Sequence, residues 1–170
     1  GSPTDDNAPL TALVRQSLEN DPVCQNDLDR AAALIRERQT RTKRFFESVA
    51  ATWEDRKSEV LGDLDLNRII ADKIRTPGVV ADLGCGTGSL MVMLKQRTET
   101  VIGVDSSSGM LEQARLCAGA VPGINLRLGE LEYLPMRDRE ADAAVMNKVL
   151  HHVAEPVKVL AEANRILKEG

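Results

Sequence analysis

The sequence predicts an α/β fold with a parallel sheet, preceded by a helical segment. From residue 79 onward, short stretches typical of buried strands alternate with stretches of helical periodicity. This alternation indicates parallel strands joined by right-handed helical crossovers. In addition, the first strand runs directly into Gly84, Gly86 and Gly88, and a helix follows these glycines. Together the two observations predict a Rossmann-like sheet with a ligand-binding turn after its first strand.

The strands are expected at 79–83, 100–105, 125–128 and 142–147, and the helices at about 89–96, 109–118 and 155–167. We expect the strand order 3-2-1-4, which places a ligand across the carboxyl ends near the first strand, where the order reverses. One further amphipathic helix is expected before the sheet, at about 65–75, and its predicted inward residues are Leu66, Ile69, Ile70 and Ile74.

Residues 1–40 are interpreted as an N-terminal helical linker and residues 41–170 as the α/β domain. A helix carrying Leu10 and Leu18 is expected to end at Asp21-Pro22. The next helical stretch runs to Trp53, as two helices or one bent helix with the junction near Thr40. Five basic residues near that junction are interpreted as a solvated helical face: Arg36, Arg38, Arg41, Lys43 and Arg44.

The composition is ordinary for a soluble globular protein, since 42% of the 170 residues are hydrophobic and 28% are charged. No stretch has the length and hydrophobicity of a membrane span, so no membrane partner is expected. A net charge of -4 argues against nucleic-acid binding over the whole chain. The three cysteines, Cys24, Cys85 and Cys117, have neither disulfide-pair nor metal-ligand spacing and favour reduced thiols in a cytoplasmic protein without a metal site.

The glycine loop is followed by a serine, Ser89, where the dinucleotide fingerprint has glycine. Asp82 lies two residues before Gly84, where its carboxylate would repel a pyrophosphate and attract a ligand that carries positive charge. Asp82 could instead brace the loop by accepting backbone N–H bonds, and both roles are compatible.

The second strand ends at Asp105, twenty-one residues beyond Gly84. This is the spacing expected for a carboxylate that accepts hydrogen bonds from both hydroxyls of a ribose. The alternative is that Asp105 is the N-cap of the helix that follows.

These residues resemble a known family, the class I S-adenosylmethionine-dependent methyltransferases. The segments D-L-G-C-G-T-G and V-I-G-V-D are similar to its first two motifs, and L-G-E-L-E-Y-L-P is similar to its third. The resemblance implies that Glu130 bonds the adenine amino group and that the amide of Leu131 bonds the adenine ring. It also implies that Asn147 lies beside the methionine part of the cofactor.

The cofactor that the resemblance implies is S-adenosylmethionine, and the protein would transfer its methyl group to a small-molecule acceptor. No residue is assigned a catalytic role, because an in-line methyl transfer requires mainly positioning and a water-poor pocket. The predicted cofactor-binding residues are Asp82, Gly84, Cys85, Gly86, Gly88, Asp105, Ser106, Met110, Glu130, Leu131 and Asn147.

The family's sheet has seven strands, so the resemblance implies a sheet truncated after its fourth strand, with the C-terminal strands missing. Strand 142–147 would then be an exposed edge that favours a homodimer, exchange of elements or aggregation. Segments before residue 30 resemble the linker that follows an ArsR-like winged-helix domain in some bacterial methyltransferases. In that case nucleic acid would be bound only by an upstream domain absent from this chain.

Several alternatives remain open. The chain could be a regulatory module that binds S-adenosylmethionine without turnover, or a nicotinamide-dependent oxidoreductase, against which Asp82 and Ser89 argue. His151 or His152 could be a catalytic base. The simpler interpretation is that one of the two histidines faces solvent and the other packs against the protein. Phe46 and Trp53 belong to a segment that resembles the family's lid helix, although such residues are more often part of the core.

Overall fold

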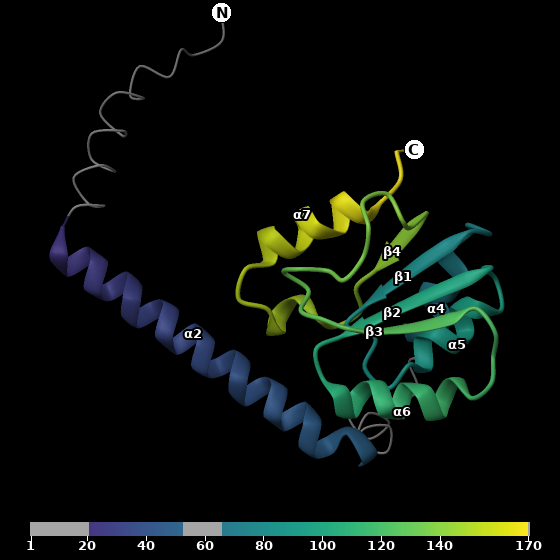
Figure 1. Cartoon of the computed structure of the whole chain (residues 1–170), viewed down its shortest axis with the longest axis horizontal. Coiled ribbons are helices and arrows are strands. Elements are labelled where there is room, and N and C mark those ends of the chain that lie inside the picture. Colours follow the sequence, from purple (N-terminus) through teal and green to yellow (C-terminus); the bar gives the residue numbers. More distant parts are fainter. Residues whose placement is uncertain (1–20, 53–65, 170) are drawn as a thin grey trace, which may run out of the picture. The chain divides into compact units, whose positions relative to one another are not determined.

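The computed structural model describes residues 21–52 and 66–169, and the chain divides into two compact units between Arg38 and Gln39. The second unit contains a parallel four-stranded sheet, drawn in Figure 1. Its spatial order is β3-β2-β1-β4, which confirms the expected order. The strands are β1 (Val79–Leu83), β2 (Thr100–Asp105), β3 (Ile124–Leu128) and β4 (Ala143–Val145).

The described helices agree with the expected pattern from residue 66 onward. They are α2 (Pro22–Val49), the 3-10 helix η1 (Ala50–Thr52), α4 (Leu66–Lys73), α5 (Ser89–Lys95), α6 (Ser108–Ala118), the 3-10 helix η2 (Leu150–His152) and α7 (Pro156–Ile166).

Of the two alternatives for this stretch, the structure shows a single helix, because α2 is continuous through the expected junction near Thr40. Polar residues interrupt the apolar stripe there, but no proline or glycine interrupts the backbone hydrogen bonds between residues 23 and 49. The Asp21-Pro22 pair begins this helix, and the carboxylate of Asp21 accepts a 2.7 Å hydrogen bond from the amide of Val23. The expected helix around Leu10 lies outside the described residues.

Two apolar layers sandwich the sheet, one on each face, as the placement of the helices in Figure 1 illustrates. Side chains alternate along β1, so Ala81 and Leu83 face α7 while Val80 faces α4 and α5. All three of these residues are fully buried. Near-continuous burial of a strand is expected when helices cover both faces of a parallel sheet.

Helix α4 packs with a different face inward from the one the sequence predicts. Ile69 is exposed, whereas Asn67 and Ala71 are buried. The inward stripe therefore comprises residues 67, 70, 71 and 74 rather than 66, 69, 70 and 74. A polar residue occupies an inward position because it has hydrogen-bond partners there, which are described below with the site.

Strand β4 is shorter than predicted and forms one edge of the sheet over Ala143–Val145. Before it, the amide of Asp142 donates to the carbonyl of Val79 at 2.8 Å, and the carboxylate of Asp142 accepts a 2.7 Å hydrogen bond from the amide of Val79. After α7 the chain lies parallel to this region through a single bridge between Ala141 and Leu167. The amide of Lys168 donates to the carbonyl of Ala141 at 2.9 Å, which completes that bridge.

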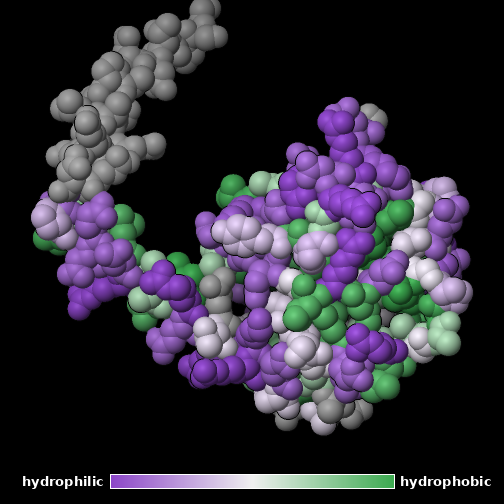
Figure 2. All heavy atoms as spheres, viewed as in Figure 1, coloured by the Kyte–Doolittle hydropathy of each residue, from purple (hydrophilic) through white to green (hydrophobic). Residues whose placement is uncertain are grey.

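The described part of α2 carries exposed apolar side chains, and Figure 2 shows apolar patches among the hydrophilic ones along it. Val23, Leu28 and Leu34 are the most exposed of them before residue 38. Within the described residues, no helix combines the length and the hydrophobicity that crossing a membrane requires.

Candidate functional site

The glycine loop after β1 has a backbone that only glycine adopts readily. Gly84, Gly86 and Gly88 have φ angles of 78°, 53° and 80°, in the left-handed region. The amides of Gly84 and Cys85 donate to the carbonyl of Val104 at 2.8 and 3.1 Å, which ties the loop to β2. A side chain at Gly86 would extend into open space, with no atom within 4 Å of its Cβ. The loop therefore presents bare backbone beside an open region.

Asp82 and Cys85 flank the start of this loop and are both buried. Asp82 is 2% exposed, and although the residue takes part in other interactions, its buried Oδ2 atom accepts no hydrogen bond among the described residues. The Cys85 thiol packs in the core that contains α5. Burial, and after it the charges of Asp82 and Asp105, raise the pKa of this thiol. Cys85 is therefore a packing side chain in the thiol form.

Asp105 ends β2 and connects two loops through its carboxylate. Its Oδ2 accepts from the amide of Gly86 and its Oδ1 from the amide of Ser107, both at 2.9 Å. Burial raises its pKa although these amides oppose the shift. Ser107, not Asp105, is the N-cap of α6, because its Oγ accepts the amide of Met110 at 3.1 Å. The alternative role of Asp105 as that N-cap is thus wrong, and Ser106 lies half-buried between the two.

Glu130 and Leu131 follow β3 and point to different environments. Glu130 is exposed, and its Oε1 accepts a 3.0 Å hydrogen bond from Nζ of Lys43. Leu131 is buried against the core on the α7 side of the sheet. The amide of Gly129 donates to the backbone carbonyl of Asp105 at 3.0 Å, so the ends of β2 and β3 are joined directly before Glu130.

The segment after Leu131 is held by two arginine–carboxylate networks. Arg165 of α7 bonds both Glu162 and Asp138, each at 2.7 Å, and the carbonyl of Met136 at 2.9 Å. Arg127 of β3 bonds Glu140 with both terminal nitrogens, at 3.1 and 2.6 Å. These charge-assisted bonds tie residues 134–140 to α7 and β3, shortly after Glu130 and Leu131 in the sequence.

Asn147, two residues after β4, belongs to a polar chain that the sequence analysis missed. Its Nδ2 donates to Oδ1 of Asn67 at 3.1 Å, and Nδ2 of Asn67 donates to Oγ of Ser89 at 3.0 Å. The chain links β4, α4 and the first residue of α5. Asn67 was missed because a polar residue in an amphipathic helix is normally assigned to the outer face. Lys148, which follows Asn147, has a left-handed φ of 59°, an unusual conformation for a residue other than glycine.

The last turns of α2 contact the segments that follow β2, β3 and β4. Lys43 and Glu47 make two of these contacts, and neither was predicted as a site residue. Lys43 bonds Glu130, and the carboxylate of Glu47 accepts the amides of Ser108 and Gly109, each at 2.9 Å. Val49 and Ala50 pack on Met110, which is 2% exposed.

Phe46 packs edge-on against His152 of η2, with ring centroids 5.1 Å apart. His152 is half-buried and His151 is exposed, as the simpler interpretation of this pair predicts. Trp53 lies outside the described residues. Phe46 thus contacts both a loop side chain and the small cluster around Met110.

The carboxyl edge of the sheet therefore carries an acidic side chain within two residues of the end of each of three adjacent strands: Asp82, Asp105 and Glu130. Glu130 lies close enough to raise the pKa of Asp105, after the larger effect of burial. Among the described residues, no group of three or more histidine, cysteine or acidic side chains could hold a metal ion. The site is thus an acidic rim around an open glycine loop.

The family described as "Methyltransferase domain" matches residues 81–170. The chain is similar to a ubiquinone biosynthesis O-methyltransferase of Hahella chejuensis, at 32% identity over 133 residues, which cover 74% of this chain and 56% of that protein. It is also similar to a demethylmenaquinone methyltransferase of Symbiobacterium thermophilum, at 37% identity over 97 residues, which cover 54% of this chain and 39% of that protein.

Among solved structures, the chain resembles an S-adenosylmethionine-dependent methyltransferase of Thermotoga maritima, with 35% identity and a TM-score of 0.59. That match covers 74% of this chain and 56% of the other. The chain spans less than three fifths of the length of each of these three proteins. The family match covers the glycine loop, all of β2 to β4 and α7, and so the chain belongs to the class I S-adenosylmethionine-dependent methyltransferase family.

Proposed function

We propose that this chain binds S-adenosylmethionine across the carboxyl ends of β1 to β4, and that the protein transfers the methyl group to a small-molecule acceptor. The observation that carries the proposal is the acidic rim of Asp82, Asp105 and Glu130 around an open glycine loop. A doubly wound sheet binds its ligand at this edge, where the strand order reverses between β1 and β4.

The chemistry of the rim fits this cofactor better than it fits a dinucleotide. A pyrophosphate would lie beside the buried carboxylate of Asp82, an unfavourable pairing of like charges. S-adenosylmethionine instead carries a sulfonium and an ammonium group, together with ribose hydroxyls that can donate hydrogen bonds. The open space at Gly86 leaves room for a ligand to approach the backbone.

Each predicted residue then has a distinct role. Asp82 stabilises the positive charge of the amino-acid end, and Asp105 accepts the ribose hydroxyls with the lone pairs left by its two amide bonds. Glu130 and the amide of Leu131 bind the adenine, while Ser106 and Met110 form the wall between ribose and base. Gly84, Cys85, Gly86 and Gly88 contribute backbone, and Asn147 lies beside the amino-acid end, oriented by Asn67.

The cofactor supplies an activated methyl group that a nucleophilic atom of the acceptor can displace. This chain's residues hold the donor in line and exclude water, which is the main requirement of such a transfer. The side from which the acceptor would approach is lined by Asn147 and by the contact between Phe46 and His152. The names of the two curated relatives suggest quinol-like or phenolic acceptors as the first class to try.

Titration calorimetry of the purified chain with S-adenosylmethionine, S-adenosylhomocysteine and NAD⁺ tests the binding half of the proposal. We expect saturable binding of both sulfur-containing ligands and none of NAD⁺. Binding of NAD⁺ alone, or of none of the three, would overturn the proposal.

The transfer half is tested by following the release of S-adenosylhomocysteine from a version of the chain extended to the length of its relatives. A panel of phenols, quinols and amines serves as acceptors. Release that depends on one acceptor class supports enzymatic transfer. A chain that binds the cofactor tightly yet turns over with no acceptor would favour a regulatory module instead.

A further inference from the structure

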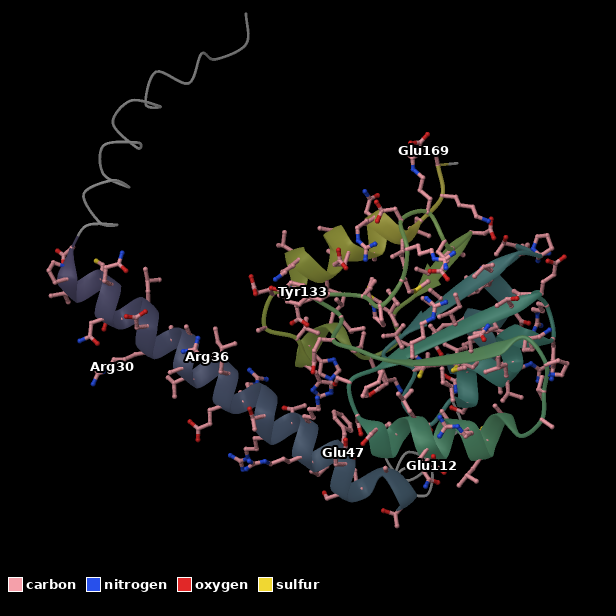
Figure 3. All side chains as sticks on the ribbon, in the orientation of Figure 1. Arg30, Arg36, Glu47, Glu112, Tyr133 and Glu169 are labelled. Atoms are coloured by element: carbon pink, nitrogen blue, oxygen red, sulfur yellow. The ribbon has the colours of Figure 1, made fainter. Side chains whose placement is uncertain are left out.

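We infer that Glu47 is a positioning residue that couples docking of the end of α2 to cofactor affinity. This inference rests on the proposed function, because it concerns the same ribose-binding turn. Figure 3 labels Glu47 on α2, near the start of α6.

Three successive amides of this turn are held by two carboxylates. The amide of Ser107 donates to Asp105, and the next two amides, those of Ser108 and Gly109, donate to the two oxygens of Glu47. The hydroxyl of Ser108 also lies 3.3 Å from Glu47. Asp105 fixes the turn from the side of the glycine loop, and Glu47 fixes it from the side of α2.

The electrostatics of this arrangement favour an ionised Glu47. The first amides of a helix carry no intrahelical partner and attract negative charge. Although desolvation by burial raises it, the pKa of Glu47 lies below its ordinary value because the amides of Gly109 and Ser108 and the hydroxyl of Ser107 donate to the carboxylate. The contact is therefore a pair of charge-assisted hydrogen bonds.

The contact also depends on a glycine at the other partner. A Cβ added at Gly109 would lie 2.6 Å from Oε2 of Glu47, too close for the present position of that carboxylate. Gly109 has no positive φ angle, so alanine there would bring no backbone strain. The glycine is thus needed for close approach of α2 and not for the turn itself.

The same segment of α2 touches the neighbouring loops on either side. One turn before Glu47, Lys43 pairs with Glu130, and the adjacent Phe46 packs on His152. A docked α2 therefore holds the proposed ribose, adenine and acceptor loops together. If the cofactor binds the docked arrangement preferentially, weaker docking lowers the apparent affinity in proportion to the docked population.

The test compares Glu47→Ala, Gly109→Ala and the control Glu112→Ala in the chain as it exists. Glu112 lies on the same helix α6 and is exposed in a pair with Arg115, within three residues of Gly109. We expect the dissociation constant for S-adenosylhomocysteine to rise about tenfold in Glu47→Ala and several-fold in Gly109→Ala, with no change in Glu112→Ala. Because alanine favours the helix, Gly109→Ala should keep or raise the melting temperature while it weakens binding.

Hydrogen exchange supplies a readout that a purely structural role would not move. In the wild type, S-adenosylhomocysteine should slow amide exchange in residues 40–49, and this response should be lost in Glu47→Ala. Unchanged affinity for S-adenosylhomocysteine in Glu47→Ala would overturn the inference. So would wild-type amide exchange in residues 40–49 that does not change when the ligand is added. Neither result would contradict the proposed function. A wild type that binds no cofactor would overturn both.

Discussion

The carboxylate of Asp105 accepts a hydrogen bond from the amide of Gly86 at 2.9 Å, which joins the end of β2 to the glycine loop at the end of β1. The predicted ribose ligand and the predicted cofactor loop are therefore one hydrogen-bonded unit. A substitution at either residue should therefore weaken ligand binding, because it disturbs both the ribose ligand and the glycine loop.

Replacing Asp105 with alanine should weaken binding of S-adenosylhomocysteine by at least roughly tenfold. A charge-assisted hydrogen bond contributes about 1.5–3 kcal/mol, and about 1.4 kcal/mol corresponds to a factor of ten in affinity. Calorimetry on the folded variant measures the change, with Asp72→Ala as control, since Asp72 is an exposed carboxylate paired with Arg97. Equal affinity of wild type and Asp105→Ala would remove Asp105 from the site.

Replacing Gly86 with valine should abolish cofactor binding while most helical content remains. The side chain would extend into the open space of the loop, and its φ of 53° is strained for any residue with a Cβ. Gly119→Val is the control for a strained glycine outside the site, because Gly119 has a φ of 56° and no atom within 4 Å of an added Cβ, at the other end of α6.

Both glycine variants should lose stability, by about 1–2 kcal/mol of left-handed strain at Gly86 and by at least as much at Gly119, whose ψ of -137° lies outside the left-handed region. Circular dichroism and thermal melting measure both losses, and calorimetry then compares binding. Normal binding by Gly86→Val would show that the ligand lies elsewhere.

Replacing Asn67 with alanine should lower the free energy of unfolding by about 1–3 kcal/mol. The change leaves the amide of Asn147 and the hydroxyl of Ser89 without their present partner in a partly buried region. Urea unfolding measures the loss, and Asn164→Ala, an exposed change on α7, should have little effect. If both variants unfold at the same urea concentration, the polar chain does not stabilise the fold.

Acid should remove the contribution of the pair formed by Arg127 and Glu140. The hydrogen bonds from Arg127 lower the pKa of Glu140 from 4.5 to about 2. Because the folded pKa lies below the unfolded one, the stabilisation is complete above about pH 4.5 and is lost as the pH falls toward 2.

Arg127→Met should therefore lower stability at pH 7 and flatten its decline between pH 4.5 and 2. Thermal melting as a function of pH measures both effects, and Arg115→Met, in an exposed pair with Glu112, should leave the profile unchanged. An Arg127→Met profile parallel to that of the wild type would contradict the assignment.

The free side of β4 should make the chain self-associate. Within the described sheet, β4 has a neighbour on one side only, apart from the bridge between Ala141 and Leu167. Unpaired backbone groups on an apolar edge favour pairing with another chain. Light scattering across a concentration series should show a rising mean mass, and a constant monomer mass at all concentrations would contradict the expectation.

The sequence by itself determined the sheet, its order and the acidic rim. Alternating elements and the run from Val79 to Gly88 depend on local patterns, and a parallel sheet with right-handed crossovers admits few arrangements of four strands. The spacing from Gly84 to Asp105 was also predictable from the sequence, because Gly84 directly follows β1 and Asp105 ends β2, and the two strands are neighbours in that sheet.

Only the tertiary structure decided which polar residues support the rim. Asn67 and Glu47 lie in helices where a polar side chain is normally assigned to solvent, and their partners, Asn147 and Gly109, are 80 and 62 residues away in the sequence. No periodicity or local spacing encodes such a pair, because it depends on how two helices rotate as they pack against the sheet. Packing turns Asn67 inward and brings Glu47 to the start of α6. There the first helix amides have no intrahelical acceptor and can donate to its carboxylate, and the glycine at residue 109 leaves room for that carboxylate.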